Sequence, residues 1–320
     1  MIFVSWLRRA LAAVGSFALL FTTAHAAAPQ VKTQAPGYYR FMLGAFEVTV
    51  LFDGALNLKP KDLLTNTTPA QVDKLLARHF EKDAVPTSVN GFLVNTGTML
   101  VLIDTGAGAL FGPGLGSLVV NLKAAGYAPE QVDDVLITHM HGDHVGGLVA
   151  DGKIVFPNAT VHADRHEAEF WLSQANLDNA PQDKKQFFQG AMTALNPYAA
   201  AGKLRTFDGD TEILAGVHAR AARGHTPGHT VYAIESSGQK LVLWGDLMHV
   251  AAVQFPQPQV TIRFDTDSKA AAAQRRKAYA AAAKEGYLVG AAHIPFPGIG
   301  HLRAEGKGYA WVPVDYAPVR

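Results

Sequence analysis

Short stretches with a two-residue hydrophobic period dominate the first third of the chain. Residues 46–52 alternate between apolar and polar side chains and lead into Asp53-Gly54, which predicts a strand that ends in a turn. Apolar residues at 92–94 and 99–103 flank a Thr-Gly pair, which predicts a β-hairpin. This part of the chain is therefore expected to begin a sheet.

Helical periodicity and further strands follow. Residues 115–125 predict a helix closed by Gly126, and the apolar run 132–137 predicts a strand that leads directly to His139. Later strands are expected at residues 231–234, 241–244 and 287–291. No unit of roughly 20–50 residues repeats, so groups of strands with helices between them favour one layered α/β domain.

Between the last two of these strands, residues 268–285 are rich in alanine and predict an amphipathic helix on the outside of the domain. We expect Arg275, Arg276 and Lys277 on its solvated face. A nucleic-acid-binding helix is the alternative, but the whole chain has a formal net charge of only +1. Phosphate binding would require a clustered basic excess, so no nucleic-acid partner is expected.

The first 26 residues (1–26) have the layout of a signal peptide. Arg8 and Arg9 precede an apolar stretch, and Ala24-His25-Ala26 places small residues at the cleavage site. The apolar stretch is shorter than the ~20 residues of a membrane-spanning helix, so a membrane anchor is the less favoured alternative. We expect an exported protein, periplasmic or secreted, without membrane contact after cleavage and with 27–320 as its single domain.

Composition fits a domain held together by its core. Of the 320 residues, 48% are hydrophobic and 17% are charged, which is enough for one large globular domain. The chain contains no cysteine, so it forms no disulfide. For the same reason, any metal site must take its ligands from His, Asp and Glu.

A dense cluster of metal-ligand side chains follows the strand expected at 132–137. His139, His141, Asp143 and His144 lie within six residues, and nearby glycines give the backbone the freedom for a tight turn around a metal. An open zinc site uses three protein ligands, so four ligands in one turn favour sharing between two metals.

This run resembles the signature of the metallo-β-lactamase superfamily, with the form His139-x-His141-x-Asp143-His144-x-Gly146. Other parts of that pattern follow the same order along the chain: Asp104 in Ile103-Asp104-Thr105-Gly106, His225 in Gly224-His225-Thr226-Pro227-Gly228-His229, Asp246 in Gly245-Asp246, and His293 in Ala292-His293. The resemblance implies an α/β fold, the αβ/βα sandwich, with a dinuclear metal site at the edge of the sheets.

Carried over by position, the resemblance implies two divalent metal ions, with zinc as the expected metal. One would be held by His139, His141 and His225. The other would be held by Asp143, His144 and His293, and Asp246 would bridge the pair. His229 is the alternative to His225, but the motif favours His225 and leaves His229 to contact a ligand or pack beside it. Asp104 would accept a hydrogen bond from a ligand imidazole and fix its tautomer.

Two differences separate this chain from other branches of the superfamily. The redox di-iron branch has Glu at the position of His141, and the dizinc β-lactamases use a Cys ligand that this chain lacks. The resemblance therefore implies hydrolysis by a hydroxide that bridges the two metals, with Asp143 and Asp246 orienting it.

The closer resemblance is to the methyl-parathion-hydrolase and aryl-lactonase (dihydrocoumarin-hydrolase-like) group, and it covers nearly the whole mature chain. Examples are Phe170-Trp171-Leu172-Ser173-Gln174 and Phe296-Pro297-Gly298-Ile299-Gly300-His301. It implies an aromatic-walled pocket over the metals, formed here by Phe111, Trp171 and Phe187, although composition alone would assign such residues to the core. The pocket would favour a flat apolar group next to the scissile bond.

His249 is the difference with most bearing on the substrate. Phosphotriesterases of the group have an apolar residue three positions after the bridging Asp, whereas quorum-signal lactonases of the superfamily have Tyr. A histidine offers a hydrogen bond to a carbonyl or leaving group, so we expect His249 to be catalytic and to line the pocket, with Phe264 narrowing it. The alternative is a loop histidine without a role.

The sequence thus predicts a dizinc hydrolase that acts on a small apolar lactone or aryl ester. The first alternative is a hydrolase of organophosphate triesters of the methyl-parathion type. The non-enzyme alternative is a periplasmic metal-binding protein, disfavoured because structural zinc sites are closed whereas these ligands leave room for water. The resembling group also makes a homodimer an expectation.

Overall fold

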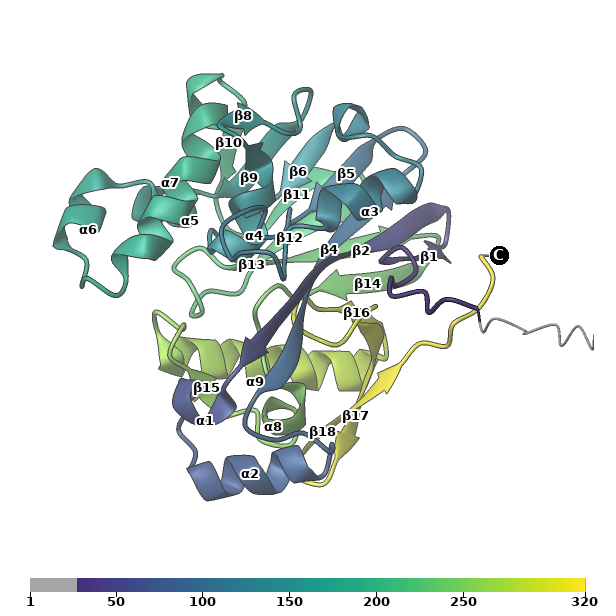
Figure 1. Cartoon of the computed structure of the whole chain (residues 1–320), viewed down its shortest axis with the longest axis vertical. Helices are drawn as coiled ribbons and strands as arrows, with labels where there is room; N and C mark the ends of the chain where they lie inside the picture. The colour runs from purple at the N-terminus through teal and green to yellow at the C-terminus, as the bar shows by residue number, and fades with distance from the viewer. Residues whose placement is uncertain (1–27, 320) are drawn as a thin grey trace, which may run out of the picture. The chain divides into compact units, whose positions relative to one another are not determined.

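The computed structural model describes residues 28–319 (Figure 1). The signal peptide predicted for residues 1–26 lies outside the described residues. Residues 28–35 contain no helix or strand. They do not belong to the compact unit that starts at Pro36. Within the described residues, no helix is both long enough and apolar enough to cross a membrane.

Two seven-stranded sheets lie at the centre of residues 36–319 (Figure 1). The first sheet has the order β1-β2-β4-β5-β6-β9-β10, antiparallel from β1 to β5 and parallel from β5 to β10. Its strands are β1 Tyr38–Leu43, β2 Phe46–Leu58, β4 Val85–Asn95, β5 Leu100–Ile103, β6 Asp134–Leu136, β9 Thr160–Asp164 and β10 Leu204–Phe207.

The second sheet has the order β11-β12-β13-β14-β16-β17-β18, antiparallel except for the β14–β16 pair. Its strands are β11 Thr211–Leu214, β12 Val217–Ala221, β13 Thr230–Ser236, β14 Gln239–Leu243, β16 Leu288–Gly290, β17 Ile299–Glu305 and β18 Gly308–Pro313. Two short pairs complete the strands: β3 Leu64–Thr65 with β15 Thr261–Ile262, and β7 Val149–Ala150 with β8 Lys153–Ile154.

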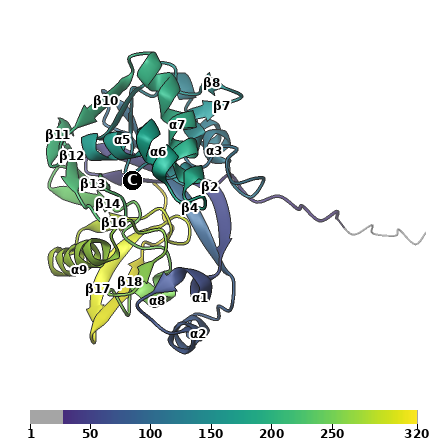
Figure 2. The same ribbon diagram turned by 90° about the vertical axis from the view of Figure 1, so that its left-hand side faces the viewer.

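Helices lie on the outer sides of both sheets and in the segments that connect the strands. They are α1 Pro60–Leu63, α2 Pro69–Ala77, α3 Leu118–Ala124, η1 Pro129–Gln131, α4 Gly142–Val145, η2 Gly146–Leu148, α5 Arg165–Trp171, α6 Gln174–Asn179, α7 Lys185–Ala200, α8 Ala251–Gln254 and α9 Ser268–Glu285. In Figure 1, α3, α5 and α7 lie on the side of the first sheet and α9 on the side of the second. Figure 2 shows α1, α2 and α8 together near the ends of β2 and β4.

The alternation of apolar side chains along the strands explains this layering. In the β4–β5 hairpin, Leu93 and Leu102 point to the helices, where they pack with residues of α3 and α7. Phe92 and Ile103 point the other way and pack against the second sheet. Because successive side chains of a strand face opposite sides, a continuous apolar run serves two cores. The expected αβ/βα sandwich is confirmed.

The prediction that the strand ends in a turn at Asp53-Gly54 is wrong, since β2 continues to Leu58. The pairing with β4 shifts register between Phe52 and Gly54, which is a β-bulge, and Gly54 has a φ of 146°. The buried Asp53 carboxylate accepts hydrogen bonds, each of 3.0 Å, from three backbone N–H groups, those of Ala107, Gly116 and Leu118. The Asp-Gly pair therefore anchors the loop after β5 and does not end a strand.

The helix expected at 115–125 begins three residues later, at Leu118. Gly116 has a φ of 91°, a left-handed conformation that a helix cannot contain. The residues before 118 belong to the loop that Asp53 anchors.

The helix expected at 268–285 has those bounds, but the placement of Arg275 on its solvated face is wrong. The Arg275 side chain is 0% exposed, and its guanidinium donates to carbonyl oxygens of the segment after β14, those of Leu247, Pro258 and Val260. Arg276 is exposed as expected. Arg275 shares a helical face with Tyr279 and Ala282, and that face packs against the second sheet.

Candidate metal centre

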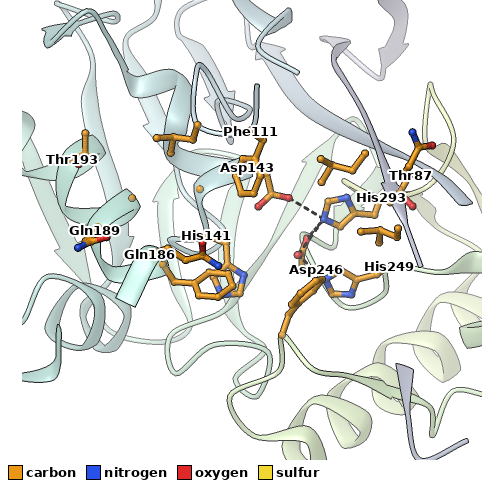
Figure 3. Close-up of a pocket in the computed structure, with 18 residues that line it drawn as sticks. Thr87, Phe111, His141, Asp143, Gln186, Gln189, Thr193, Asp246, His249 and His293 are labelled. Atoms are coloured by element: carbon orange, nitrogen blue, oxygen red, sulfur yellow. Dashed lines mark hydrogen bonds and ion pairs between the residues drawn. The ribbon is translucent and has the colours of Figure 1, made fainter. Parts of the chain in front are cut away.

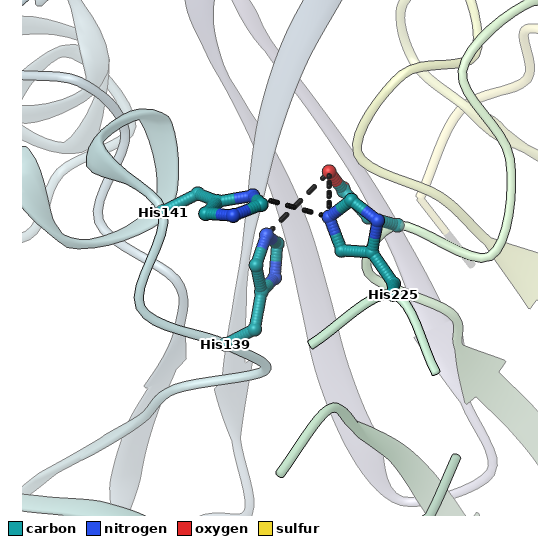
Figure 4. Close-up of side chains that lie close together, drawn as sticks. His139, His141 and His225 are labelled. Carbon is teal, nitrogen blue, oxygen red and sulfur yellow. Dashed lines mark hydrogen bonds and ion pairs between the residues drawn. The ribbon is translucent and has the colours of Figure 1, made fainter. Parts of the chain in front are cut away.

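Loops at one edge of the two sheets bring the seven predicted ligands together. One group of donor atoms, all within 4.8 Å of one another, comes from His139, His141, His225 and Asp246 (Figure 4). A second group within the same limit comes from Asp143, His144 and His293. Parallel strands deliver most of these residues: the first four follow β6, Asp246 follows β14 and His293 follows β16. The carboxyl ends of parallel strands meet at one sheet edge, so ligands distant in sequence converge there.

The turn that carries the first four ligands depends on a close backbone approach. His141 is extended and precedes the single-turn helix α4, so His139 and His141 project differently from Asp143 and His144. A Cβ atom at Gly146 would lie 2.1 Å from the Ala107 carbonyl oxygen. Glycine is therefore required for the loop after β5 to pack against this turn.

Hydrogen bonds at Nδ1 orient three of the histidines. His144 Nδ1 lies 2.8 Å from Asp104 Oδ2, His225 Nδ1 lies 2.9 Å from Asp265 Oδ1, and His293 Nδ1 lies 2.8 Å from the Ser88 carbonyl oxygen. Each contact places the proton on Nδ1 and leaves the Nε2 lone pair free. The three Nε2 atoms all face the Asp246 carboxylate, at 3.1–3.3 Å. Partners of this kind hold metal-binding imidazoles in one tautomer.

Asp104 is itself held rigidly. Its backbone has a φ of 58°, and its carboxylate accepts hydrogen bonds from the Thr138 backbone N–H at 2.9 Å and the Thr138 hydroxyl at 2.7 Å. The sequence predicted that Asp104 contacts a ligand imidazole, and the structure places it against His144.

The geometry distinguishes His225 from His229. His229 Nε2 accepts a hydrogen bond from the Asp246 backbone N–H at 3.0 Å, and its Nδ1 donates to the Ala222 carbonyl at 3.2 Å. Burial lowers the pKa of His229 to about 3, which keeps the ring neutral in this role. Both of its nitrogens are therefore used, whereas His225 Nε2 points into the group with His141 (Figure 4).

The donor set fits two divalent cations. His139 Nε2, His144 Nε2 and Asp246 Oδ1 are buried and have no hydrogen-bond partner among the described residues. Buried polar atoms are nearly always satisfied, so converging orphaned nitrogens and oxygens indicate that something else binds them. Imidazole nitrogens and carboxylate oxygens in groups of three and four are the ligands of zinc and similar ions.

Burial and neighbouring charges shift the pKa values of several groups in the cluster strongly. Burial lowers the pKa of His139 and His141 well below the ordinary value. Burial alone would raise the pKa of Asp246, but the surrounding histidines, with His293 and His144 foremost, hold it well below its usual range. Strongly perturbed ionisable groups that share one cleft are typical of active sites.

His249 lies beside this cluster. Its Nε2 is 2.9 Å from Asp246 Oδ2 but without hydrogen-bond alignment, and both ring nitrogens have no hydrogen-bond partner among the described residues. The ring stacks on His293, with 5.1 Å between centroids. Burial lowers the pKa of His249 to about 4, so its ring is neutral at pH 7. Gln254 holds the loop by accepting from the backbone N–H groups of His249 and Val250.

A cavity of about 550 Å³ opens above the cluster (Figure 3). His141, Asp143, Asp246 and His293 line it on the cluster side. Four of the five predicted pocket residues also line it, namely Phe111, Phe187, His249 and Phe264. Trp171 lines a neighbouring cavity instead, because α5 places its ring edge-on against His141, with 5.3 Å between centroids.

Sequence reasoning missed several residues of this cavity. Gln186, Gln189 and Thr193 line it from one face of α7 (Figure 3), and their spacing of three and four residues was a signal available in the sequence. Leu56, Leu58 and Leu110 add apolar wall from β2 and from the loop after β5. Nothing local indicated these leucines.

Two buried carboxylates that support the cluster were also missed. Asp265 orients His225 and accepts the Ile262 backbone N–H with its other oxygen at 3.1 Å. Glu167 on α5 accepts the backbone N–H groups of Met140 and Gly228, both at 2.8 Å, and so joins the two loops that carry histidine ligands. The signal for Glu167 in the sequence was its helical spacing from Phe170 and Trp171, which puts an acid beside two large aromatic residues.

Known proteins with similar sequences and structures share this architecture. A solved structure described as hydrolase AbOPH in the beta lactamase superfamily is 40% identical, covers 89% of this chain and 100% of its own, and superposes with a TM-score of 0.85. AidC, described as a dizinc quorum-quenching lactonase in complex with a product, is 29% identical, with coverage of 88% and 98% and a TM-score of 0.82.

Curated relatives match over a shorter region. An N-acyl homoserine lactonase of Bacillus cereus is 29% identical over 126 residues, which is 39% of this chain and 42% of the lactonase. This chain thus spans about two fifths of the length of that relative. The family model of the metallo-beta-lactamase superfamily matches residues 84–293. This range contains all seven predicted ligands. On these matches and on its fold, the chain belongs to the metallo-beta-lactamase superfamily.

Proposed function

We propose that this protein is a metal-dependent hydrolase that opens lactones or cleaves aryl esters, in line with the methyl-parathion-hydrolase and aryl-lactonase group that its sequence resembles. The observation that carries the proposal is the cavity of about 550 Å³, which joins a two-metal donor set to a neutral, unpartnered imidazole and an apolar wall. The lactonase described for AidC and the one from Bacillus cereus support this choice of substrate class.

In this proposal, His139, His141 and His225 would hold one ion, and Asp143, His144 and His293 would hold the other. Asp246 would serve both, because it belongs to the first group and its Oδ1 lies 3.1 Å from Nε2 of His144 and of His293. Zinc suits these donors, and when bound, two such ions supply an acidified water and polarise a substrate carbonyl.

The chain's own residues position the reactants. Asp143 and Asp246 have carboxylate oxygens at the cavity floor, where they can accept hydrogen bonds from an attacking water. His249 lines the same cavity, and neither of its buried ring nitrogens has an aligned hydrogen bond to a described residue, so the ring could donate to the substrate carbonyl or to the leaving oxygen. A lactone or ester needs such a donor, because negative charge develops on both of those oxygens.

The walls select for an apolar substrate. Leu56, Leu58, Leu110, Phe111 and Phe264 face the same cavity as the cluster. Burying a flat apolar group against them removes water from the reacting bond and strengthens electrostatic interactions there.

A substrate panel on the zinc-loaded protein tests the proposal: aromatic lactones, aryl esters, thioesters and phosphotriesters at equal concentration. We expect the highest kcat/KM for lactones or aryl esters, loss of turnover on chelation, and nearly complete loss in Asp246→Ala. Binding of about two zinc ions without turnover of any compound would support the metal-binding-protein alternative instead.

The panel also decides between the ester and phosphotriester alternatives. His249→Leu removes the hydrogen-bond donor and introduces an apolar side chain, as expected of phosphotriesterases in the resembling group. We therefore expect the ratio of phosphotriester to lactone kcat/KM to increase. An unchanged ratio would show that His249 does not set this preference.

We also propose that the protein is exported and that residues 1–26 are removed. The support is the charge and hydropathy layout of this segment in the sequence. N-terminal sequencing of the protein from a periplasmic or culture fraction tests this, with Ala27 as the expected first residue.

A further inference from the structure

A second cavity, of about 430 Å³, lies next to the one above the cluster. His141, Phe187 and Phe264 line both cavities, so these three side chains stand between them. Everything else that lines the second cavity comes from α5, α6, the first turn of α7 with the segment that leads into it, and the loop after β15. It adjoins the candidate active site and shares this part of its wall, whereas the rest of its lining differs.

Aromatic rings form much of the wall of the second cavity. Phe170, Trp171 and Phe188 pack on one another, with ring centroids 4.7–5.3 Å apart. Trp171 also packs against His141 of the cluster. Trp171 and Phe188 are each only 4% exposed, so they offer their edges beside the half-buried Phe170. A flat aromatic group placed there gains both burial and ring–ring contact.

The second cavity also has a positive rim. Among the described residues that line the two cavities, Lys184 and Arg263 are the only lysine or arginine, and both belong to the second. The Lys184 ammonium lies 3.1 Å from the Arg263 carbonyl oxygen and 5.4 Å from the centroid of the Phe187 ring, so it is held at the partition between the cavities.

Neither cation is neutralised by a carboxylate in the second cavity. The one acid in its lining, Asp265, already accepts from His225 and from the Ile262 backbone. Arg263 donates its Nε to the Asp62 carbonyl, and its terminal nitrogens have no hydrogen bond to any described residue. Lys184 is half-buried and Arg263 is exposed, and neither forms an ion pair with a described carboxylate, so both can bind an anion at this rim.

We propose that the second cavity is a subsite for an aromatic carboxylate, either as an arm of the substrate or as the acid that remains after hydrolysis. The ring would lie against Phe170, Trp171 and Phe188, and the carboxylate would pair with Lys184 and Arg263. The link to turnover rests on the proposed ester or lactone hydrolysis, whereas binding of the aromatic acid does not.

Two matched probe pairs test the subsite on the zinc-loaded full chain. The first pair is 4-acetoxybenzoate and its methyl ester, compared by kcat/KM for release of the acetyl group. The second pair is 4-hydroxybenzoate and the uncharged 4-hydroxyacetophenone, which has no ester bond, compared by calorimetric binding without any turnover. Lys184→Gln and Arg263→Gln each remove one cation, and Lys185→Gln is the control because its ammonium points to the Asp178 carbonyl and lines neither cavity.

We expect the charged member of each pair to be favoured. Lys184→Gln and Arg263→Gln should each reduce that preference about two- to fivefold, the range for a partly exposed ion pair, and Lys185→Gln should leave it unchanged. The preference should also fall as salt is raised. Since Arg263 also contacts α1 through the Asp62 carbonyl, Lys184→Gln gives the decisive result if Arg263→Gln lowers the Tm.

The outcomes separate this inference from the proposed function. If both acetoxy esters are hydrolysed but the preference is absent, or changes equally in Lys185→Gln, the subsite is refuted and the hydrolase stands. If neither ester is hydrolysed, the aryl-ester proposal fails, and the calorimetric pair still decides whether the cavity binds an aromatic carboxylate.

Discussion

Replacing Arg275 by methionine removes a buried guanidinium but keeps a long apolar side chain in its place. In the structure this guanidinium donates to the carbonyl oxygens of Leu247, Pro258 and Val260, which belong to the segment that follows Asp246. The Val260 oxygen keeps a second donor, the Gln254 side-chain amide at 3.1 Å. The other two oxygens lose the only hydrogen bonds that the described residues provide.

The expected loss of stability follows from those two oxygens. A buried carbonyl left without a partner costs about 1–3 kcal/mol, and relief from burying a charge offsets part of the total. We therefore expect the free energy of unfolding to fall by about 2–4 kcal/mol. At roughly 2–4 °C per kcal/mol for a domain of this size, the Tm should fall by roughly 5–15 °C.

Circular dichroism of the zinc-loaded protein measures this, with Arg276→Met as the matched control. Arg276 is the same residue type on the next position of α9, and it is exposed, so its replacement should change the Tm by less than about 2 °C. Activity should fall in Arg275→Met as well, because the released segment also carries His249. Equal Tm values for the two variants would refute the reasoning that Arg275 holds this segment.

Three further predictions concern the supports of the site. Asp265→Asn should weaken zinc binding about 10–100-fold in competition with a chromophoric chelator, since the amide nitrogen must face either the His225 Nδ1–H or the Ile262 N–H and so disturbs the orientation of His225, while exposed Asp178→Asn should not. Chelation should abolish hydrolysis and lower the Tm, both restored by zinc, because an ion at about a thousand times its Kd stabilises the fold by about 4 kcal/mol. Asp53→Asn should lower the free energy of unfolding in urea by about 2–4 kcal/mol, since its amide nitrogen must face a backbone N–H. Exposed Asp183→Asn should have no effect, and equal losses in the two variants would contradict this role for Asp53.

Local signals in the sequence predicted the ends of α9 well. Asp267 accepts from the Ala270 backbone N–H at the first turn, and Gly286 closes the helix with a φ of 69°. Both are residue types that favour those positions through interactions within a few residues. The side that the helix buries was less accessible, because an alanine-rich segment gives a weak hydrophobic face and Arg275 resembles its exposed neighbours.

The supports of the site could not be predicted in the same way. Asp53 contacts Leu118 at a separation of 65 residues, and Asp265 contacts His225 at a separation of 40. Neither carboxylate has a local motif, and the Asp-Gly pair at 53 has the composition of a turn. The role of Asp53 becomes visible only in the structure, where the β-bulge directs its side chain toward the loop after β5.

The sequence alone determined the chemistry of the centre, because imidazoles and carboxylates closely spaced after a buried strand have few uses other than binding metal. It also determined the layered α/β fold through the alternation of apolar residues. The tertiary structure decided which histidine nitrogens remain free, as it did for His225 against His229. It also decided which aromatic residues face which cavity, separating Trp171 from Phe111. These properties depend on contacts between segments far apart in the chain, and periodicity and motif spacing carry no record of such contacts.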